Sequence, residues 1–314
     1  MILALRALGV GDLVTAVPAL RGLRQAFAGE PLVLAAPTWL APLVELIGGV
    51  DRVVATDGLT GPPVPVHRPR LAVNLHGRGP QSHRLLQATG PAALWAFAQP
   101  AAGHLDGPRW DDDEHEVHRW CRLLRHHGVP ADESDLSLAV PDVAVERGVT
   151  IVHPGAKAPS RRWPPERFAA VARALARRGH RVLITGSPAE QPLTVRVARA
   201  AGLGCAAAGV TGLGQLAALV AHARLVISGD TGVAHLATAY GTASVVLFGP
   251  VPPCRWGPPP ERPWHRAIWH GERAERGDDP RPAVHPALLR IGVDEVLANA
   301  RSAMTECTPI RVRR

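Results

Sequence analysis

Short apolar runs alternate with amphipathic stretches along the first third of the chain. Residues 2–8 (ILALRAL) have the pattern of a buried strand, and residues 13–27 carry apolar side chains at helical spacing. Three more strand-like runs follow at 32–36, 52–56 and 71–75. This repeated alternation of strand and helix predicts a parallel, doubly wound sheet.

The same alternation restarts after a break at residues 130–149, which contain Pro130, Pro141 and several acidic residues. We interpret this break as the linker between two Rossmann-like α/β domains, residues 1–145 and 146–314. Four strand-like runs follow it, each running into a glycine at or near its end: 149–155, 180–186, 223–230 and 243–250. Loops beyond the carboxyl ends of parallel strands gather at one edge, so each domain is expected to offer a ligand site there.

Charge, proline and glycine mark the helix boundaries. Residues 111–128 predict a helix with an acidic start and Gly128 as its stop, which is the polarity that the helix dipole favours. Two prolines open the predicted helix 166–178, and Gly179 closes it.

The last part of the chain is less regular. Residues 250–286 are rich in Pro, Arg and His and show no period. A final helix is expected near 286–303, followed by a basic tail at 310–314 that we expect to be mobile. The predicted fold is therefore α/β throughout, with a C-terminal helix.

Length and composition fit this picture of two domains. The chain has 314 residues, 46% of them hydrophobic, which is ample for two buried cores. It contains no run of 18 apolar residues and no signal-peptide pattern at its start, so we expect a cytoplasmic protein without a transmembrane segment. The cysteines are far apart and form no C-x-x-C pair, which argues against a disulfide framework or a zinc site: Cys121, Cys205, Cys254 and Cys307.

The formal net charge of +8 comes almost entirely from arginine, because Lys157 is the only lysine. A basic balance can indicate nucleic acid or a membrane surface as a partner. However, the chain has no RNP-type segment, recognition-helix pattern or aromatic-interleaved basic stripe. We therefore expect no nucleic-acid partner and favour a compositional bias combined with a site for a small anionic molecule.

The first candidate site is Gly9-Val10-Gly11-Asp12, directly after the first predicted strand. It lacks the third glycine of the dinucleotide fingerprint G-x-G-x-x-G. Asp12 is a suitable N-cap for the next helix. It could equally act at the edge of the sheet as a carboxylate that takes a proton from an attacking hydroxyl. The two interpretations are compatible.

The second candidate site is the loop 153–157 (HPGAK) together with Ser160-Arg161-Arg162. Three cations and a glycine loop at the end of a strand suit a diphosphate. The alternative is a solvated arginine loop. The single lysine of the chain, Lys157, lies in this segment and favours the phosphate interpretation slightly.

The third candidate site is residues 227–235 (ISGDTGVAH), where a strand ends and a helix begins. Free backbone N–H groups from Thr231 and Gly232 onward would meet at the helix N-terminus, where the dipole favours an anion. Asp230 could alternatively be a simple N-cap. An aspartic-protease interpretation of D-T-G fails, because that chemistry needs a second such motif in an all-β setting.

Four segments resemble, in order and spacing, the heptosyltransferase-like glycosyltransferases of family 9. The resemblance covers most of the chain, and the joint occurrence of the four segments is far more specific than any one of them. The segments are ILALRALGVGDLVTAVPALRGLR, HPGAKAPSRRWPPERFAAVA, ISGDTGVAHLA and VVLFGPVPPCRWGP. The resemblance implies the GT-B fold, in which two Rossmann-like lobes face a central cleft, an inverting mechanism without a metal, and typically ADP-heptose as the donor.

The resemblance also implies roles for single residues. Asp12 falls where the family has its proposed general base, and Arg161 stands where the family commonly has a lysine on the donor phosphates. His76 and Arg78 lie in a segment similar to the family's loop near the acceptor. The remaining donor-binding positions implied are Gly11, Lys157, Glu190, Asp230, Thr231, Gly232 and His235.

The chain departs from the family pattern after Gly249-Pro250. The family usually continues Thr-Asp-Pro, whereas this chain has Val251-Pro252-Pro253, which removes two polar groups near the donor and leaves the donor's identity open. Asp111–Asp113 could be mistaken for the metal-binding D-x-D of another glycosyltransferase fold, but we expect a solvated helix start there. The scattered histidines form no metal set, so no metal or other cofactor is expected.

The sequence thus predicts an enzyme that moves a sugar from a nucleotide diphosphate to an acceptor hydroxyl. The acceptor, a lipopolysaccharide-type glycan or a small-molecule metabolite, cannot be inferred from the sequence. Two alternatives stay open. An epimerase of the same fold would convert the donor without an acceptor, and a catalytically silent partner protein would bind the donor without an Asp12-dependent product.

Overall fold

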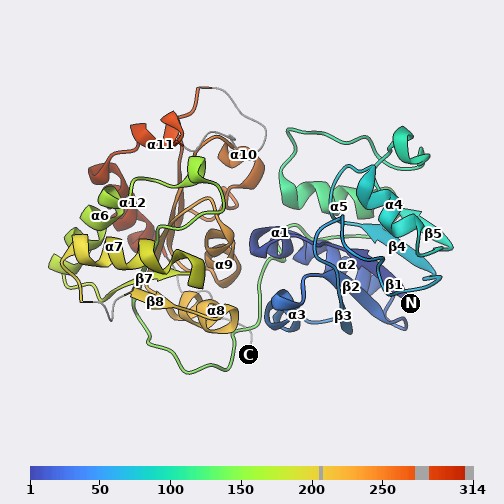
Figure 1. The fold of residues 1–314 in the computed structure, drawn as a ribbon, viewed down its shortest axis with the longest axis horizontal. Coiled ribbons are helices and arrows are strands. Elements are labelled where there is room, and N and C mark those ends of the chain that lie inside the picture. Colours follow the sequence, from blue (N-terminus) through green and yellow to red (C-terminus); the bar gives the residue numbers. More distant parts are fainter. Residues whose placement is uncertain (205–207, 273–282, 308–314) are drawn as a thin grey trace. The chain divides into compact units, whose positions relative to one another are not determined.

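The computed structural model describes residues 1–204, 208–272 and 283–307 (Figure 1). The chain divides into two compact units, Met1–Ala139 and Val140–Arg314, and the division falls within residues 130–149. The expected basic tail at 310–314 and Cys205 lie outside the described residues. Each unit is an α/β domain with its own parallel sheet.

The first unit is built on a five-stranded sheet with the order β3-β2-β1-β4-β5, and all neighbouring strands are parallel. Every residue of the central strand β1 is buried, which is why its sequence is an unbroken apolar run. The strands are β1 (Ile2–Leu5), β2 (Leu32–Ala36), β3 (Arg52–Ala55), β4 (Leu71–Asn74) and β5 (Ala93–Trp95). The helices are α1 (Val10–Thr15), α2 (Val17–Ala26), α3 (Ala41–Ile47), α4 (Gln81–Gln87) and α5 (Glu116–His126), with short 3-10 turns η1 (Thr38–Leu40) and η2 (Pro100–Ala102).

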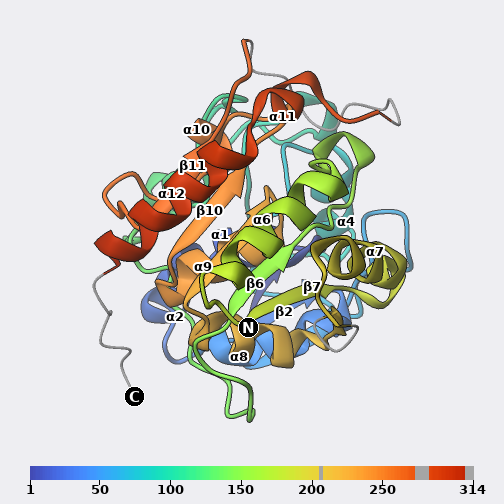
Figure 2. The same ribbon diagram turned by 90° about the vertical axis from the view of Figure 1, so that its left-hand side faces the viewer.

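The second unit has a six-stranded parallel sheet with the order β11-β10-β9-β6-β7-β8. Helices α6 and α12 lie side by side against this sheet (Figure 2). The strands are β6 (Thr150–His153), β7 (Val182–Gly186), β8 (Ala208–Val210), β9 (Leu225–Gly229), β10 (Ser244–Leu247) and β11 (His265–Ile268). The helices are α6 (Pro165–Arg177), α7 (Gln191–Ala201), α8 (Leu213–His222), α9 (Gly232–Tyr240), α10 (Pro253–Trp256), α11 (Pro286–Arg290) and α12 (Val293–Glu306), with 3-10 turns η3 (Pro159–Arg161) and η4 (Pro188–Glu190).

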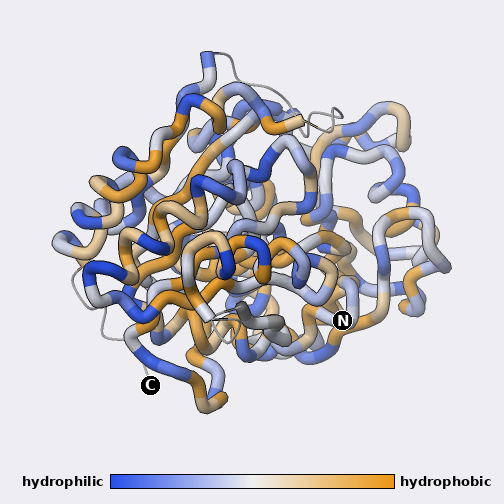
Figure 3. Tube along the Cα trace, turned by 60° about the vertical axis from the view of Figure 1, so that its left-hand side comes forward, coloured by the Kyte–Doolittle hydropathy of each residue, from blue (hydrophilic) through white to orange (hydrophobic). Residues whose placement is uncertain are grey.

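The core of the second unit lies between the central strands and the helices that cover them. Hydrophobic segments run through its interior, and hydrophilic residues gather on the outer turns of the helices (Figure 3). Trp163 lies in the loop before α6, and Phe168 lies near the start of α6. Both side chains are almost completely buried, and their rings pack edge to face with centroids 5.0 Å apart. This packing fixes the segment that leads from β6 into α6.

The sequence did not predict three strands, and all three lie at sheet edges. They are β5, β8 and β11, of three or four residues each. An edge strand need not be buried on both faces, so it lacks the long apolar run that marks a central strand. Strand β11, whose sequence is HRAI, lies within residues 250–286, where the sequence shows no period.

Three predicted helices have different bounds in the structure. The predicted helix 13–27 is two helices, α1 and α2, that break at Ala16. Pro18 explains the break, because it has no N–H to continue the helical hydrogen bonds and its ring clashes with the preceding turn. The predicted final helix is likewise divided, into α11 and α12, with Gly292 as the N-cap of α12. Helix α5 begins at Glu116, so the expected helix start at Asp111–Asp113 was wrong.

Candidate functional site

Asp12 lies at the carboxyl edge of the first unit's sheet, just after β1. It occupies the third position of α1, and its Oδ2 accepts a hydrogen bond of 3.1 Å from the backbone N–H of Gly9, the N-cap. The expectation that Asp12 is itself the N-cap was therefore wrong. The side chain keeps 28% of its surface exposed. A carboxylate fixed at one oxygen and open to solvent can accept a proton from a bound molecule.

The polar side chains of the first unit's edge come from β1 and β4, which are neighbours in the sheet. The chain places β2 and β3 on one side of β1 and β4 on the other, so the strand order reverses between β1 and β4. Open α/β sheets bind ligands at such a switch point. Asp12 follows β1, and His76 follows β4.

His76 is a neutral group in this structure. Burial, together with the nearby positive charge of Arg6, lowers the pKa of His76 to about 4. Its Nδ1 accepts a hydrogen bond of 3.2 Å from the backbone N–H of Ala7, so the proton of the neutral ring is assigned to Nε2. His76 can therefore donate one hydrogen bond to a ligand but adds no charge.

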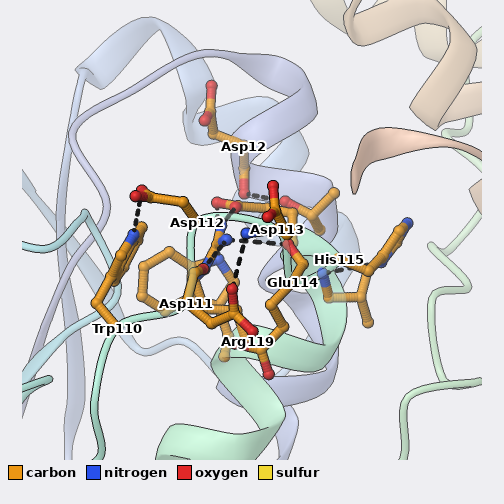
Figure 4. A network of polar contacts seen from close by, with 12 residues as sticks. Asp12, Trp110, Asp111, Asp112, Asp113, Glu114, His115 and Arg119 are labelled. Atoms are coloured by element: carbon orange, nitrogen blue, oxygen red, sulfur yellow. Dashed lines mark hydrogen bonds and ion pairs between the residues drawn. The ribbon is translucent and has the colours of Figure 1, made fainter. Parts of the chain in front are cut away.

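Arg78 lies beyond His76 and is mostly exposed. Its Nη1 is 3.8 Å from Oδ1 of Asp112, which also accepts a hydrogen bond of 3.0 Å from the indole N–H of Trp110. In Figure 4 the side chain of Asp12 points away from the acidic side chains of Asp112 and Asp113. The acidic segment 111–113 is thus a turn with internal partners, since Asp111 Oδ1 also accepts from the N–H of Asp113 at 2.9 Å.

The sequence reasoning missed the groups that surround Asp12 from the protein interior. Arg6 is completely buried, donates from Nε to the carbonyl of Asp12 at 2.8 Å, and lies 3.6 Å from its carboxylate. Glu116, at the start of α5, accepts a hydrogen bond of 2.9 Å from Arg6. The available signal was a charged residue inside the apolar run ILALRAL, because arginine is rarely buried unless it is paired.

The second unit brings Arg161 and Asp230 together at its own switch point. The strand order reverses between β6 and β9, and these strands are followed by η3 and by the D-T-G segment. Arg161 Nη1 lies 3.2 Å from Oδ2 of Asp230, and Asp230 is 8% exposed. Gly229 permits this approach, because a Cβ there would meet the carbonyl oxygen of Arg161 at 3.2 Å. A partly exposed guanidinium is thereby oriented at the edge of the sheet.

Helix α9 begins at this same edge. Its N-cap is Thr231, so the alternative of Asp230 as the N-cap was wrong by one position, and Gly232 is its first residue. The backbone N–H groups of a helix's first turn are free to bind an anion. Thr231 Oγ1 is buried and has no hydrogen-bond partner among the described residues. The ring of His235, further along α9, packs edge to face with the ring of Trp256, and the two ring centroids are 5.8 Å apart.

Glu190 covers the glycine loop that follows β6. Its Oε2 accepts hydrogen bonds of 2.9 Å from the N–H and the hydroxyl of Ser187, and a Cβ on Gly155 would lie 2.0 Å from its Oε1. Only glycine at position 155 permits this packing. Lys157, two residues further on, is exposed and makes no hydrogen bond or ion pair with the part of the chain that the structure describes. The predicted residues of the second unit therefore lie in the segments that follow β6, β7 and β9.

The described residues contain neither a cluster of metal ligands nor a helix that could span a membrane. Across residues 1–204, 208–272 and 283–307, no group of three or more His, Cys, Asp or Glu side chains is placed to hold a metal ion. No helix in these ranges is both long and apolar enough to cross a membrane.

Two doubly wound parallel sheets in one chain are the architecture of the GT-B fold, and solved structures with this fold match nearly the whole chain. An E. coli ADP-heptose lipopolysaccharide heptosyltransferase II has the same fold, with a TM-score of 0.77 and 21% identity over 97% of this chain and 98% of that chain. A family 9 glycosyltransferase from Veillonella parvula gives a TM-score of 0.76 at 20% identity, with 97% of each chain covered. The E. coli heptosyltransferase WaaC, solved with ADP, gives 0.71 at 17% identity, over 96% of this chain and 99% of that chain.

The sequence model of glycosyltransferase family 9 (heptosyltransferase) matches residues 107–276, more than half of the chain. The protein therefore belongs to this family. Among curated relatives, lipopolysaccharide heptosyltransferase 3 of Escherichia coli is 29% identical over 46% of this chain and 44% of its own length. Lipopolysaccharide heptosyltransferase 2 of Salmonella typhimurium is 28% identical over 55% of this chain and 52% of its own. The chain thus spans about half the length of the curated relatives it matches.

Proposed function

We propose that the protein is an inverting glycosyltransferase that transfers heptose from ADP-heptose to an acceptor hydroxyl, with Asp12 as the general base. The observation that carries this proposal is the placement of Asp12 at the switch point of the first unit, fixed at one carboxylate oxygen and partly open to solvent. Membership of a heptosyltransferase family supports the donor class. The relatives are lipopolysaccharide heptosyltransferases by name, which supports a lipopolysaccharide-type glycan as the acceptor.

The proposed reaction is a single displacement. The acceptor oxygen forms a bond to the anomeric carbon while the bond from that carbon to the diphosphate oxygen breaks, and the hydroxyl proton passes to the Asp12 carboxylate. Negative charge grows on the leaving ADP. Arg161, Lys157 and the N-terminus of α9 are the groups that would stabilise this charge, and the ion pair with Asp230 orients Arg161 for this role. Such cations can carry the charge that a metal ion carries in other transferases.

The first test is a binding panel with ADP, GDP, UDP and TDP, followed by ADP-heptose, in buffer containing EDTA. We expect ADP and ADP-heptose to raise the melting temperature selectively, because a ligand that binds only the folded state stabilises it. Selective stabilisation by another nucleotide would contradict the donor assignment. The segment Val251-Pro252 would then be the first place to examine.

The second test is Asp12→Asn, assayed by release of ADP from ADP-heptose with a heptose-deficient lipopolysaccharide core oligosaccharide as acceptor. The amide oxygen of Asn can still accept the Gly9 N–H, so we expect the variant to fold and to bind ADP normally. We expect turnover to fall by roughly 10²- to 10⁴-fold, the usual contribution of a general base. Near-normal turnover would refute the base assignment.

Two measurements separate the two alternatives from the proposed transferase. An epimerase would convert ADP-heptose into a stereoisomer, visible by NMR, with no acceptor present. A silent binding protein would bind ADP-heptose and release no ADP with any acceptor.

A further inference from the structure

Arg6 is a buried cation with a complete set of protein partners around Asp12. It follows β1, is 0% exposed, and stacks on the ring of Trp120 at 4.6 Å. Its guanidinium donates to the carbonyl of Asp12 at 2.8 Å, the carbonyl of Leu75 at 2.5 Å and the hydroxyl of Thr15 at 3.2 Å. Arg6 therefore joins the carboxyl ends of β1 and β4 to helix α1, and it contacts both the backbone and the side chain of Asp12.

Glu116 anchors Arg6 from the opposite side. One of its oxygens accepts from Arg6 Nη2 at 2.9 Å and from the indole N–H of Trp120 at 3.0 Å, and the other is paired with Arg119. Burial alone would raise the pKa of Glu116, but Arg6 and Arg119 hold it below its ordinary value. Glu116 is therefore an anion inside the protein, and it holds Arg6 in place through a charged hydrogen bond.

The consequence for Asp12 lies in how its two oxygens are used. Oδ2 is occupied by the N–H of Gly9 at 3.1 Å, whereas Oδ1 lies 3.6 Å from Arg6, beyond a normal hydrogen bond. Nη2 of Arg6, the nitrogen nearest Oδ1, is already bonded to Glu116 and Thr15. Without the charge of Glu116, this nitrogen would be free to bond to Oδ1 and to turn the carboxylate away from the orientation that the acceptor hydroxyl needs.

We propose that Arg6, held by Glu116, is a positioning residue that keeps Oδ1 of Asp12 oriented and free to accept the proton of the acceptor hydroxyl. This inference rests on the proposed function, because it requires Asp12 to be the base. Neither Arg6 nor Glu116 needs to touch the substrate. The pair acts on the turnover step through Asp12 and leaves substrate binding unchanged.

The test is a double-mutant cycle between Glu116→Gln and Asp12→Asn. The readout is ADP released from ADP-heptose with the heptose-deficient core oligosaccharide and, in its absence, with water as the acceptor. Glu114→Gln is the matched control, because it makes the same chemical change two residues away. Glu114 forms a two-bond pair of 2.7 Å each with Arg122 and has no contact with Arg6 or Asp12 among the described residues.

We expect Glu116→Gln to lower kcat by roughly ten- to hundredfold, the effect of a small misplacement of a reacting group, with KM for the donor unchanged. Glu114→Gln should keep wild-type kcat. In the Asp12→Asn background, Glu116→Gln should cause no further loss, because the group through which it acts is already gone. If Glu116→Gln does not give a folded protein in a thermal melt, Thr15→Val, which removes one partner of Arg6, replaces it in the same cycle.

Two results would overturn the inference. One is an equal loss of kcat in both backgrounds, which would mean that Glu116 acts through the fold and not through Asp12. The other is wild-type kcat in folded Glu116→Gln while Asp12→Asn is inactive, which leaves the proposed function standing and removes this inference alone. Full activity of Asp12→Asn would remove both.

Discussion

Replacing Arg161 with alanine tests whether the switch point of the second unit binds the diphosphate. Arg161 keeps 24% of its side chain exposed and is oriented by Asp230 at 3.2 Å. We expect Arg161→Ala to weaken ADP binding, because the variant loses the guanidinium and leaves the Asp230 carboxylate without this counter-charge. That carboxylate would then repel the ligand.

The expected magnitude follows from the type of contact. A hydrogen bond to a charged group contributes about 1.5–3 kcal/mol, and each 1.4 kcal/mol is a factor of ten in affinity. Because Arg161 is partly exposed and already paired, we expect the lower half of that range, a loss of roughly ten- to fortyfold in ADP affinity. Arg161→Lys keeps the charge without the planar guanidinium, so its ADP affinity should lie between those of Arg161→Ala and the wild type.

The assay is isothermal titration calorimetry with ADP and with adenosine. Only ADP carries the diphosphate, so Arg161→Ala should weaken ADP and leave adenosine unchanged. The matched control is Arg196→Ala on α7, which removes an arginine that is 64% exposed and paired with Glu166. Equal losses for ADP and adenosine would indicate a general distortion of the site. Unchanged ADP affinity in folded Arg161→Ala would refute the reasoning.

Two further predictions concern the second unit. Gly155→Ala would place a Cβ 2.0 Å from Oε1 of Glu190, so the Glu190 side chain must move and ADP affinity should fall. Calorimetry measures this affinity, and Gly214→Ala is the control, because a Cβ at position 214 would have no atom within 4 Å. Burial lowers the pKa of His265 to about 3, so the unfolded state takes up the proton first and stability is lost as the pH falls from 6.5 towards 3. Between pH 6.5 and 4 this loss is about 3 kcal/mol at 1.36 kcal/mol per unit, and His265→Asn, which can keep the bond to Ser244, should show a smaller loss in urea unfolding. Equal pH dependence of the two proteins would contradict the assignment.

The interior strands could be predicted from the sequence because a strand that is buried on both faces has a continuous run of apolar residues. Strand β2 was predicted with the bounds that the structure has, Leu32–Ala36, and all five of its residues are buried. Strand β5 at the edge of its sheet has only three residues, and none of them is fully buried. Propensity and periodicity reflect which side chains a segment buries, so they predict a segment least well when few of its side chains are buried.

The positions of three candidate residues could be predicted, because each lies in the segment that follows a buried strand. Asp12 lies in the segment after β1, His76 after β4 and Asp230 after β9, and the two sheets have their switch points at these strands. Which of them meet could not be read from the sequence. The pair Arg161–Asp230 joins residues 69 positions apart, and the pair Arg6–Glu116 joins residues 110 positions apart. No local period records contacts over such separations.

The burial of Arg6 is itself an argument for a role beyond stability. Taking an ion pair out of water costs about as much as the pair returns, and well-packed apolar residues of similar volume are often neutral or stabilising in its place. Arg6 is fully buried, Glu116 is 5% exposed, and Arg6 lies 3.6 Å from the partly exposed carboxylate of Asp12. We therefore expect the Arg6–Glu116 pair to orient this carboxylate and to add little to the stability of the fold. That balance is what the cycle between Glu116→Gln and Asp12→Asn measures.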